Sequence, residues 1–329
     1  MSSVAGRVLV TGGSGLVGAA VLRRLAVEGR ETVALVRSER ASESVARLGA
    51  RPVRGDVLDR DGLARALRGC DAAFHCAGVV GLCETDTVAM VRTNVEGTRN
   101  VVEAAARAGV RRIVLTSSAA TIGEERGVIA REDTPHRGWY LTAYERSKHE
   151  AERVAFERGS ELGLEVVAVN PASVQGPDRV SGTARLLLAH LRGRLPVLVD
   201  VPLAIVDVDD CARGHLLAEV HGAPGQRYLL CGASLTVREA LQIVEHATGI
   251  RRRRWFAPVR AATALGGPVE IAFRALRRRP PLCREAARAL AHGRACDGSR
   301  ASRDLGLVYT PVEDTLRRII DAFRRQGLL

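Results

Sequence analysis

The sequence contains almost no lysine. Of its 49 basic residues, Lys148 is the only lysine and the other 48 are arginines. Where such a chain keeps one lysine, we expect its compact ammonium group to do something that a planar guanidinium cannot. Tyr144 lies four residues earlier, and on a helix this spacing puts both side chains on one face. A nearby cation stabilises a phenolate, so the pair predicts a tyrosine with a lowered pKa that acts as a general acid or base. The alternative is a surface helix carrying the two residues by coincidence.

Other scarce features exclude several classes of protein. Aromatic residues make up 3% of the chain, which argues against recognition of single-stranded nucleic acid by base stacking. No apolar run reaches 18 residues, so no transmembrane span is expected, and the N-terminus lacks a signal-peptide pattern. The seven cysteines are odd in number and form no CxxC motif, so neither a disulfide framework nor a zinc site is indicated. We therefore expect a cytoplasmic protein without a metal.

The net charge of +12 is concentrated in one segment. Residues 251–280 hold nine arginines against the single acid Glu270. A solvated face of a substrate lobe is the favoured interpretation, and contact with an anionic membrane or an acidic substrate is the alternative. The sequence Gly266-Gly267-Pro268 predicts that no long helix crosses this segment. We expect no nucleic-acid partner.

Short apolar segments alternate with helical patterns along the first half of the chain. Strands are predicted at 7–10, 32–36, 53–57, 72–76, 113–116 and 166–169. This alternation predicts an α/β fold with a doubly wound parallel Rossmann sheet, whose ligands sit at the carboxyl ends of the strands. We expect a dinucleotide-binding domain over 1–178, completed by 204–231. Residues 179–203 and 232–329 would form a smaller α/β substrate lobe.

A glycine-rich turn follows the first predicted strand. In the segment 11–18, Gly12 permits the tight turn, Gly15 lets the backbone approach a pyrophosphate, and Gly18 lets the helix pack on the strand. The free N–H groups of the next helix complete a phosphate site. The predicted contacts of this turn are Gly12, Ser14, Gly15, Leu16, Val17 and Gly18.

Residues closing the next strands predict the rest of the cofactor site. Arg37, with Arg40 as a possible helper, suits the 2′-phosphate of NADP, whereas an acid there would suit NAD. NADP is therefore favoured and NAD stays possible. Asp56 could accept a hydrogen bond from adenine or cap a helix, and the small residues Ala77 and Gly78 allow close approach.

Two further features have structural interpretations. His75 lies in a predicted strand and is expected to be a packed core histidine. The acids in 207–210 could suggest a metal site, but their place at a strand end favours helix capping and hydrogen bonds between lobes.

Together these motifs resemble the extended short-chain dehydrogenase/reductases, especially the dihydroflavonol-reductase-like and hopanoid-associated sugar epimerase branches. The matching segments cover residues 7 to about 250: the glycine turn, Gly55-Asp56-Val57, His75-Cys-Ala-Gly78, Asn94-Val-Glu-Gly-Thr98, Thr116-Ser-Ser118, Tyr144-x-x-x-Lys148, Asn170-Pro171 to Pro177, and Val206 to Asp210.

The resemblance implies a role for each matching position. Tyr144 would be the general acid/base, Lys148 would lower its pKa and bind the nicotinamide ribose, and Ser118 would hold the substrate oxygen. Asn94 would support the active site. The further implied cofactor contacts are Val57, Ser117, Pro171, Ser173 and Val174. The family also suggests a homodimer formed by the helices at 87–108 and 145–158.

Three functions are compatible with these residues. The first is NADPH-dependent reduction of a ketone or aldehyde on a bulky small molecule. The second is epimerisation of a nucleotide sugar by an internal redox cycle, and the third is a regulator that senses NADPH without catalysis. Sugar dehydration is disfavoured because Ala119 and Ala120, rather than an Asp-Glu pair, follow Ser118.

Overall fold

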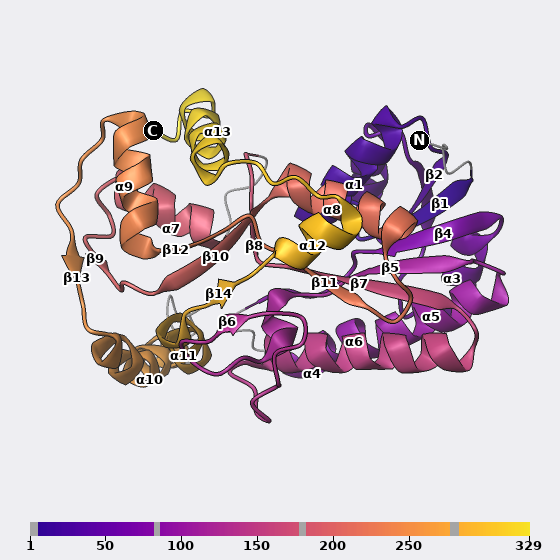
Figure 1. Ribbon diagram of the computed structural model, residues 1–329, viewed down its shortest axis with the longest axis horizontal. Helices are drawn as coiled ribbons and strands as arrows, with labels where there is room; N and C mark the ends of the chain where they lie inside the picture. Colours follow the sequence, from indigo (N-terminus) through magenta and orange to yellow (C-terminus); the bar gives the residue numbers. More distant parts are fainter. Residues whose placement is uncertain (1–5, 82–85, 178–181, 277–282) are drawn as a thin grey trace.

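The computed structural model describes residues 6–81, 86–177, 182–276 and 283–329, which form two lobes (Figure 1). The larger lobe is built on a seven-stranded sheet, and the smaller one contains short sheets and helices from the second half of the chain. The first described residues, from Gly6 onward, belong to the larger lobe, and the C-terminus lies in the smaller one.

The strands are β1 Arg7–Thr11, β2 Thr32–Val36, β3 Arg51–Arg54, β4 Cys70–His75, β5 Arg112–Thr116, β6 Ile129–Ala130, β7 Glu165–Pro171, β8 Ser173–Gln175, β9 Val197–Leu198, β10 Pro202–Asp207, β11 Arg227–Leu230, β12 Ala233–Thr236, β13 Trp255–Phe256 and β14 Ala295–Cys296. The α-helices are α1 Leu16–Val27, α2 Glu39–Ala46, α3 Arg60–Leu67, α4 Thr87–Val91, α5 Gly97–Arg107, α6 Ala143–Glu161, α7 Gly182–Leu191, α8 Val208–His221, α9 Val237–Thr248, α10 Val259–Ala275, α11 Arg284–His292, α12 Ser299–Leu305 and α13 Val312–Arg325. Two shorter turns are the π-helix η1 Arg92–Glu96 and the 3₁₀-helix η2 Ala119–Ile122.

The large sheet has the strand order β11-β7-β5-β4-β1-β2-β3, and all its neighbours are parallel. This is the doubly wound Rossmann arrangement that the alternation of strands and helices predicted, so the predicted fold class is confirmed. The strand order reverses between β1 and β4. In sheets of this kind the ligand crevice opens there, outside the carboxyl ends of the two strands.

Helices cover both faces of this sheet. Successive side chains of β1 point to opposite faces: Val8 and Val10 pack with α1 and α8, while Leu9 packs with α3 and α5. Figure 1 shows α1 and α8 along one side of the sheet and α3, α5 and α6 along the other. All three β1 side chains are fully buried, which explains why this strand has a continuous apolar run rather than an alternating pattern.

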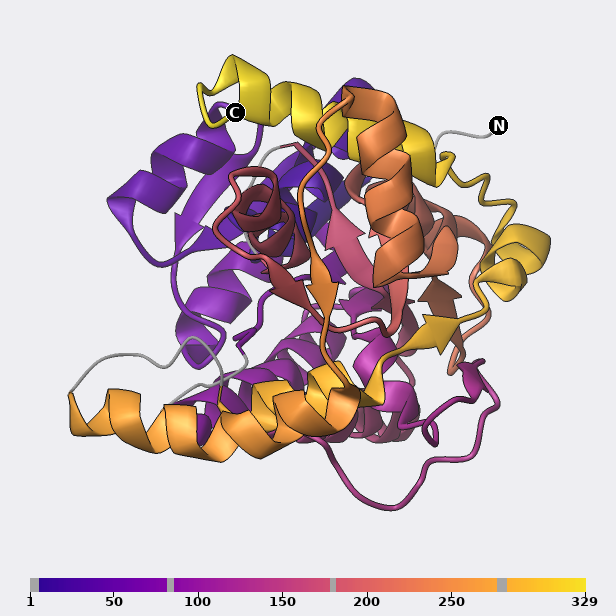
Figure 2. The ribbon, with the colours of Figure 1, turned by 90° about the vertical axis from the view of Figure 1, so that its left-hand side faces the viewer.

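The smaller lobe has its own apolar core. Leu188 from α7, Val244 from α9 and Ile319 from α13 pack in this cluster. Beside it, β10 pairs with β8 and β12 in a three-stranded sheet, so β10 does not extend the large sheet. Helices α10 and α11 lie across the lower part of the molecule in Figure 2. A capping box opens α9, because Thr236 and Glu239 bond reciprocally.

Several local predictions were wrong. Helix α10 runs through Gly266-Gly267-Pro268 without a break, and its contacts with α11 show that tertiary packing holds it. Strand β3 ends at Arg54, so Asp56 and Val57 lie beyond it. Cys70, Cys76, Cys211, Cys231 and Cys296 are free thiols, but Cys283 is disulfide-bonded.

None of the helices within the described residues is both long and apolar enough to cross a membrane.

Candidate active site

The glycine turn has the geometry of a dinucleotide cradle. Gly12 has φ +71°, and a Cβ there would lie 2.6 Å from the Ala77 backbone nitrogen. A Cβ at Gly18 would collide with the Gly12 carbonyl oxygen. The Gly15 N–H donates to that oxygen at 2.9 Å, and Gly15 caps α1, leaving the first-turn N–H groups of Leu16 and Val17 directed out of the helix. Only glycine at these positions lets the turn reach the neighbouring loop and leaves room for a phosphate.

A cavity of about 470 Å³ continues from this turn toward α2. Its wall contains two arginines, three serines and apolar residues: Ser14, Gly15, Leu16, Ala19, Arg23, Ser38, Arg40, Ala41 and Ser44. Arginines and hydroxyl groups are suited to a phosphate ester. Arg23, Ser38 and Ser44 were missed from the sequence because they become neighbours of the glycine turn only when α1 and α2 pack side by side.

Arg37 and Asp56 lie near this cavity but do not line it. They face each other across adjacent strand ends, with Arg37 Nη1 at 3.6 Å from Asp56 Oδ2. The Arg37 side chain is 75% exposed, so it is free to turn toward a ligand. Asp56 also accepts from the Leu58 N–H at 2.9 Å, whereas α3 is capped by Asp59. The capping alternative for Asp56 is therefore wrong.

The loop after β4 forms the opposite wall of the crevice. Thr11 Oγ1 accepts from the Ala77 N–H at 3.2 Å and is 2.7 Å from His75 Nδ1. The other nitrogen of His75 is 3.0 Å from Thr98 Oγ1. Burial, with a smaller effect of Lys148, lowers the pKa of His75 to about 3. His75 is thus a neutral core residue that joins β1, β4 and α5, as predicted.

Asn94 fixes the next part of this loop. Its amide accepts from the Val79 N–H at 2.7 Å and donates to the Val79 carbonyl at 3.0 Å and to Ser147 Oγ at 2.9 Å. It lies in η1, a π-turn between α4 and α5. Such turns interrupt the regular helix and often occur at functional sites. The side chain is 2% exposed, so Asn94 positions the loop that carries Gly78.

Tyr144 and Lys148 lie on one face of α6, turned toward the end of β5. The Tyr144 phenol lies close enough to the Ser118 side chain for Ser118 to lower its pKa, and Lys148 Nζ donates to the Thr116 carbonyl at 2.7 Å. Ser118 caps η2 by accepting from the Ala120 N–H at 3.2 Å. A Cβ on Gly78 would lie 3.8 Å from Lys148 Nζ. The two predicted groups are therefore together at the carboxyl edge of the sheet, beside the crevice.

The pKa of Tyr144 differs from the prediction. Burial raises it above its usual value, and the hydrogen bond from Ser118 and the charge of Arg294 lower it only in part. Lys148 is not among the groups that lower it. Burial lowers the pKa of Lys148 itself to about 8, opposed by Glu152 and Cys76. The expectation that Lys148 acidifies the phenol is thus wrong in this structure, because its ammonium group is directed at the Thr116 carbonyl.

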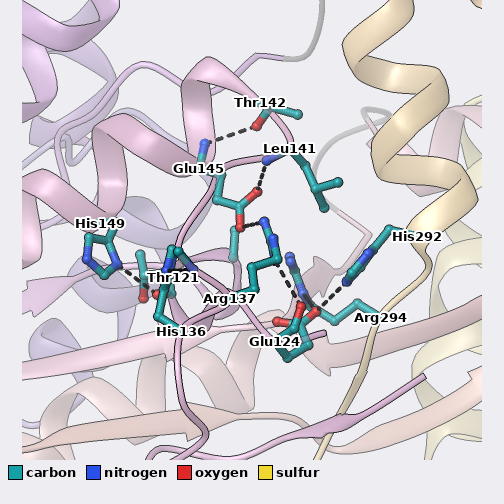
Figure 3. A network of polar contacts seen from close by, with 12 residues as sticks. Thr121, Glu124, His136, Arg137, Leu141, Thr142, Glu145, His149, His292 and Arg294 are labelled. Carbon is teal, nitrogen blue, oxygen red and sulfur yellow. Dashed lines mark hydrogen bonds and ion pairs between the residues drawn. The ribbon is translucent and has the colours of Figure 1, made fainter. Parts of the chain in front are cut away.

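A buried ion pair holds the start of α6 in place (Figure 3). Arg137 and Glu145 have side chains that are 0% and 2% exposed and form a direct contact. Glu145 also accepts from the Leu141 N–H at 2.9 Å, and its own N–H donates to Thr142 Oγ1 at 3.0 Å. These bonds fix the first turn of α6, which contains Tyr144.

Sequence reasoning missed a second positioning group, Glu152. Its buried carboxylate accepts from Asn170 at 2.6 Å and Thr121 at 3.2 Å, and lies 3.0 Å from Arg227. Asn170 also donates to the Ser118 carbonyl at 3.3 Å. The acid therefore ties α6 to the loop that carries Ser118. Nothing in the sequence marked Glu152 apart from the other acids of this helix.

The remaining predicted cofactor residues border the same edge. Ser117 bonds through its N–H to the Val169 carbonyl at 2.7 Å, and its buried Oγ has no partner in the described structure. Pro171 ends β7, and Ser173 and Val174 lie in β8. The Val57 side chain packs in the core beneath the crevice rather than into it.

The acids at 207–210 serve the roles predicted for them. Asp207 caps α8 through the Asp209 N–H at 2.8 Å and accepts from Thr315 at 2.8 Å. Asp210 accepts from the Thr310 N–H at 2.6 Å. Among the described residues, no group of three or more His, Cys, Asp or Glu side chains is arranged to hold a metal ion.

The family model described as NAD dependent epimerase/dehydratase family matches residues 8–231. The chain belongs to this family. Its members are extended short-chain dehydrogenase/reductases, as the motifs indicated.

Relatives of this chain include both reductases and epimerases by name. A protein of Synechocystis sp. provisionally named as a dihydroflavonol 4-reductase is 32% identical over 97% of this chain and 94% of its own. A ketoreductase of Stigmatella aurantiaca, named for a farnesyl dihydroquinoline-oxide substrate, is 31% identical over 98% and 96%. The crystal structure of a nucleoside-diphosphate-sugar epimerase from Pseudomonas aeruginosa is 26% identical, covers 98% of this chain and 99% of its own, and superimposes with a TM-score of 0.78.

Proposed function

We propose that this protein is an NADPH-dependent reductase of a ketone or aldehyde on a bulky, largely apolar small molecule. The observation that carries the proposal is the position of Tyr144 beside Ser118 at the carboxyl edge of the sheet, where Ser118 lowers the pKa of the phenol. Lys148 lies on the same helix face and is bonded to the Thr116 carbonyl. The names of two relatives, a dihydroflavonol 4-reductase and a ketoreductase, support reduction of a carbonyl group as the reaction.

The protonation state of Tyr144 also supports reduction. Because burial raises the pKa of the phenol, it keeps its proton at neutral pH and acts as a donor. Reduction of a carbonyl requires a proton at the oxygen, which Ser118 would hold and Tyr144 would protonate. The bound nicotinamide would supply the hydride. Lys148 would bind the ribose that carries the nicotinamide ring.

The choice of NADPH rests on the positive charge around the adenosine end. Arg23 and Arg40 line the cavity beyond the glycine turn, and Arg37 is exposed beside it. A 2′-phosphate there would accept hydrogen bonds from guanidinium and serine groups. Among the described residues that line this cavity, none is an acid that could accept a hydrogen bond from the 2′-hydroxyl of NAD.

Substitution of Tyr144 tests the chemistry. Tyr144→Phe should reduce NADPH consumption with a carbonyl substrate to about a hundredth or less, since general acid catalysis contributes about 10²–10⁴-fold. The dissociation constant for NADPH should change little. Tyr140→Phe is the matched control, because Tyr140 packs against His136 and His149 and makes no contact with Ser118. A tenth of the rate remaining in Tyr144→Phe would contradict the proposal.

Substitution of Arg40 tests the cofactor. Arg40→Ala should weaken the binding of NADPH about tenfold and the binding of NADH about twofold or less, since the substitution removes one charged partner of the 2′-phosphate. Arg37→Ala should act in the same direction. If both variants lose affinity for NADPH and for NADH by the same factor, the NADP assignment is wrong.

Epimerisation of a nucleotide sugar is the second candidate, favoured by the similarity over almost the whole chain to a nucleoside-diphosphate-sugar epimerase. An epimerase should purify with tightly held dinucleotide and interconvert sugars without net consumption of NADPH. A screen of ketones and nucleotide sugars for NADPH oxidation separates the two. We also propose a homodimer formed by the helices at 87–108 and 145–158, which sedimentation equilibrium would test.

A further inference from the structure

An exposed apolar stripe runs along helix α10. Residues three and four apart on a helix share a face, and five apolar residues of α10 follow this spacing with exposed side chains: Ala261, Ala264, Pro268, Ile271 and Ala275. Ile271 is 69% exposed, and Leu276, directly after the helix, is 67% exposed. Because the helix runs unbroken through Gly266-Gly267-Pro268, the stripe is one continuous surface.

The opposite face of α10 attaches the helix to the protein. Glu270 and Phe273 lie on that face and are less exposed than the stripe. Glu270 accepts from the N–H of Arg284, the first residue of α11, at 2.9 Å. Figures 1 and 2 show α10 and α11 at the periphery of the molecule. Since Glu270 is the single acid of residues 251–280, this segment places no acid on the exposed face.

Arginines lie at the N-terminal end of the stripe. Those before α10 and in its first turn have exposed side chains: Arg251, Arg252, Arg253 and Arg260. Glu245, a neighbouring acid, pairs instead with the less exposed Arg254. Arg253 is six residues from the start of α10, so the length of the chain keeps it within about 22 Å of the helix. The stripe therefore adjoins a positively charged surface.

Trp255 adds an aromatic ring to this surface. It is one of two tryptophans in the chain and is 61% exposed, and the Arg253 guanidinium lies 5.5 Å from the centre of its ring. Tryptophan and arginine side chains combine an apolar body with a polar end, which suits the boundary between water and lipid acyl chains. Exposed apolar residues beside arginines are typical of helices that lie in the membrane interface.

We infer that α10 and residues 251–256 form a docking surface for an anionic lipid bilayer, with the apolar stripe on the acyl chains and the arginines on lipid phosphates. Nucleic acid would match the charge, but its phosphate backbone has no apolar group to cover the stripe. A second copy of this chain would bring two positive surfaces together, which is unfavourable. A bilayer with anionic headgroups matches both features. The inference does not depend on the proposed reductase reaction.

The docking surface is connected to the active-site helix. Helix α10 packs on α11, and Glu285 in the first turn of α11 accepts from the N–H of Ala143 at 3.2 Å. Ala143 directly precedes Tyr144. Docking at α10 would therefore bring the start of α6 toward the membrane, which suits a substrate with an apolar body that partitions into lipid.

Vesicle cosedimentation tests the inference with the full-length chain. The protein should bind vesicles of phosphatidylcholine with about 30% phosphatidylglycerol at least about tenfold more tightly than vesicles of phosphatidylcholine alone, because anionic lipid attracts arginines. Raising the salt from about 0.05 M to about 0.5 M should release most of the protein, since salt screens exposed charges. Equal binding to both kinds of vesicle, or no binding at low salt, overturns the inference.

Two double variants test whether the charge acts at this surface. Arg251→Gln with Arg253→Gln should lower the vesicle partition coefficient about thirtyfold, since each arginine near an anionic surface contributes about fivefold. Arg24→Gln with Arg68→Gln removes the same net charge from exposed positions of the larger lobe. This control should change the coefficient by about twofold or less, because distant charges are screened. Equal losses in both double variants would show that net charge alone drives binding, and the docking surface would be wrong.

A single substitution tests the apolar stripe. Ile271→Gln should weaken binding to the anionic vesicles about fivefold or more, because it removes apolar area from the contact with lipid. Val27→Gln is the matched control, since Val27 is exposed at the end of α1 in the other lobe, and it should bind as the wild type does. If Ile271→Gln also binds as the wild type does, the stripe makes no contact with lipid and the inference is wrong.

Trp255 reports the orientation of the bound protein. In a Trp139→Phe variant it is the only tryptophan of the chain. Its fluorescence should shift to shorter wavelength on anionic vesicles and be quenched by lipids with brominated acyl chains. Vesicle binding without this quenching would place the contact elsewhere and overturn the inference. Failure to bind vesicles, together with a smaller assembly for Ile271→Gln in sedimentation equilibrium, would make α10 an interface between copies instead.

Discussion

The buried ammonium group of Lys148 should lower the free energy of unfolding, and the size of this effect follows from how far burial shifts its pKa. The side chain is 7% exposed, and burial lowers its pKa from 10.5 to about 8. Each pKa unit corresponds to about 1.4 kcal/mol, so keeping the ammonium charged in the folded chain costs about 3 kcal/mol at pH 7. Methionine has a similar length and no charge. Lys148→Met loses the hydrogen bond to Thr116, about 1 kcal/mol, and should therefore stabilise the protein by about 2 kcal/mol at pH 7.

The pH dependence of this difference identifies its cause. At pH 7 the lysine is protonated in both the folded and the unfolded wild type, so the whole cost is present. Above pH 8 the folded protein releases the proton while the unfolded chain keeps it up to pH 10.5, so the stability of the wild type rises with pH. The advantage of Lys148→Met should shrink by about 2 kcal/mol between pH 7 and pH 9.5.

Urea denaturation of both proteins at the two pH values measures this change. Other groups that titrate in this range are common to both chains and cancel in the difference. Arg153→Met is the matched control on the same helix, because Arg153 is exposed and pairs with Glu157; its effect should not depend on pH. A Lys148→Met variant that is less stable than the wild type at both pH values would refute the reasoning. The variant should also lose reductase activity, as expected of a residue retained for function at the expense of stability.

Three further predictions follow from single contacts. Arg137→Met should lower the free energy of unfolding by about 3–5 kcal/mol, because it leaves the buried carboxylate of Glu145 unpaired; Arg137→Met combined with Glu145→Gln should recover part of this loss in urea denaturation. Asn94→Ala should cost about 1–3 kcal/mol, since the backbone of Val79 loses both hydrogen bonds; an unchanged melting temperature would contradict this. Gly18→Ala should weaken the binding of NADPH by at least about tenfold in a fluorescence titration, because the Cβ of the alanine would displace Gly12. Unchanged affinity would show that the turn is not the phosphate site.

The sequence was sufficient for features that depend on neighbouring residues. The glycine turn, the individual strands and the α9 capping box follow from local sterics, apolar periodicity and short-range hydrogen bonds. The shared face of Tyr144 and Lys148 follows from helix geometry alone. These properties need only residues a few positions apart, so the printed order of residues determines them.

The tertiary structure decided the properties that depend on distant segments. It made Tyr144 a weaker acid, because burial desolvates the phenol and Lys148 is engaged elsewhere. It carried α10 through Pro268, where packing outweighs the local preference for a break. It also brought Arg294 next to Glu124, 170 residues away in the chain. Electrostatic energies depend on distance and desolvation in space, and neither can be read from the order of residues.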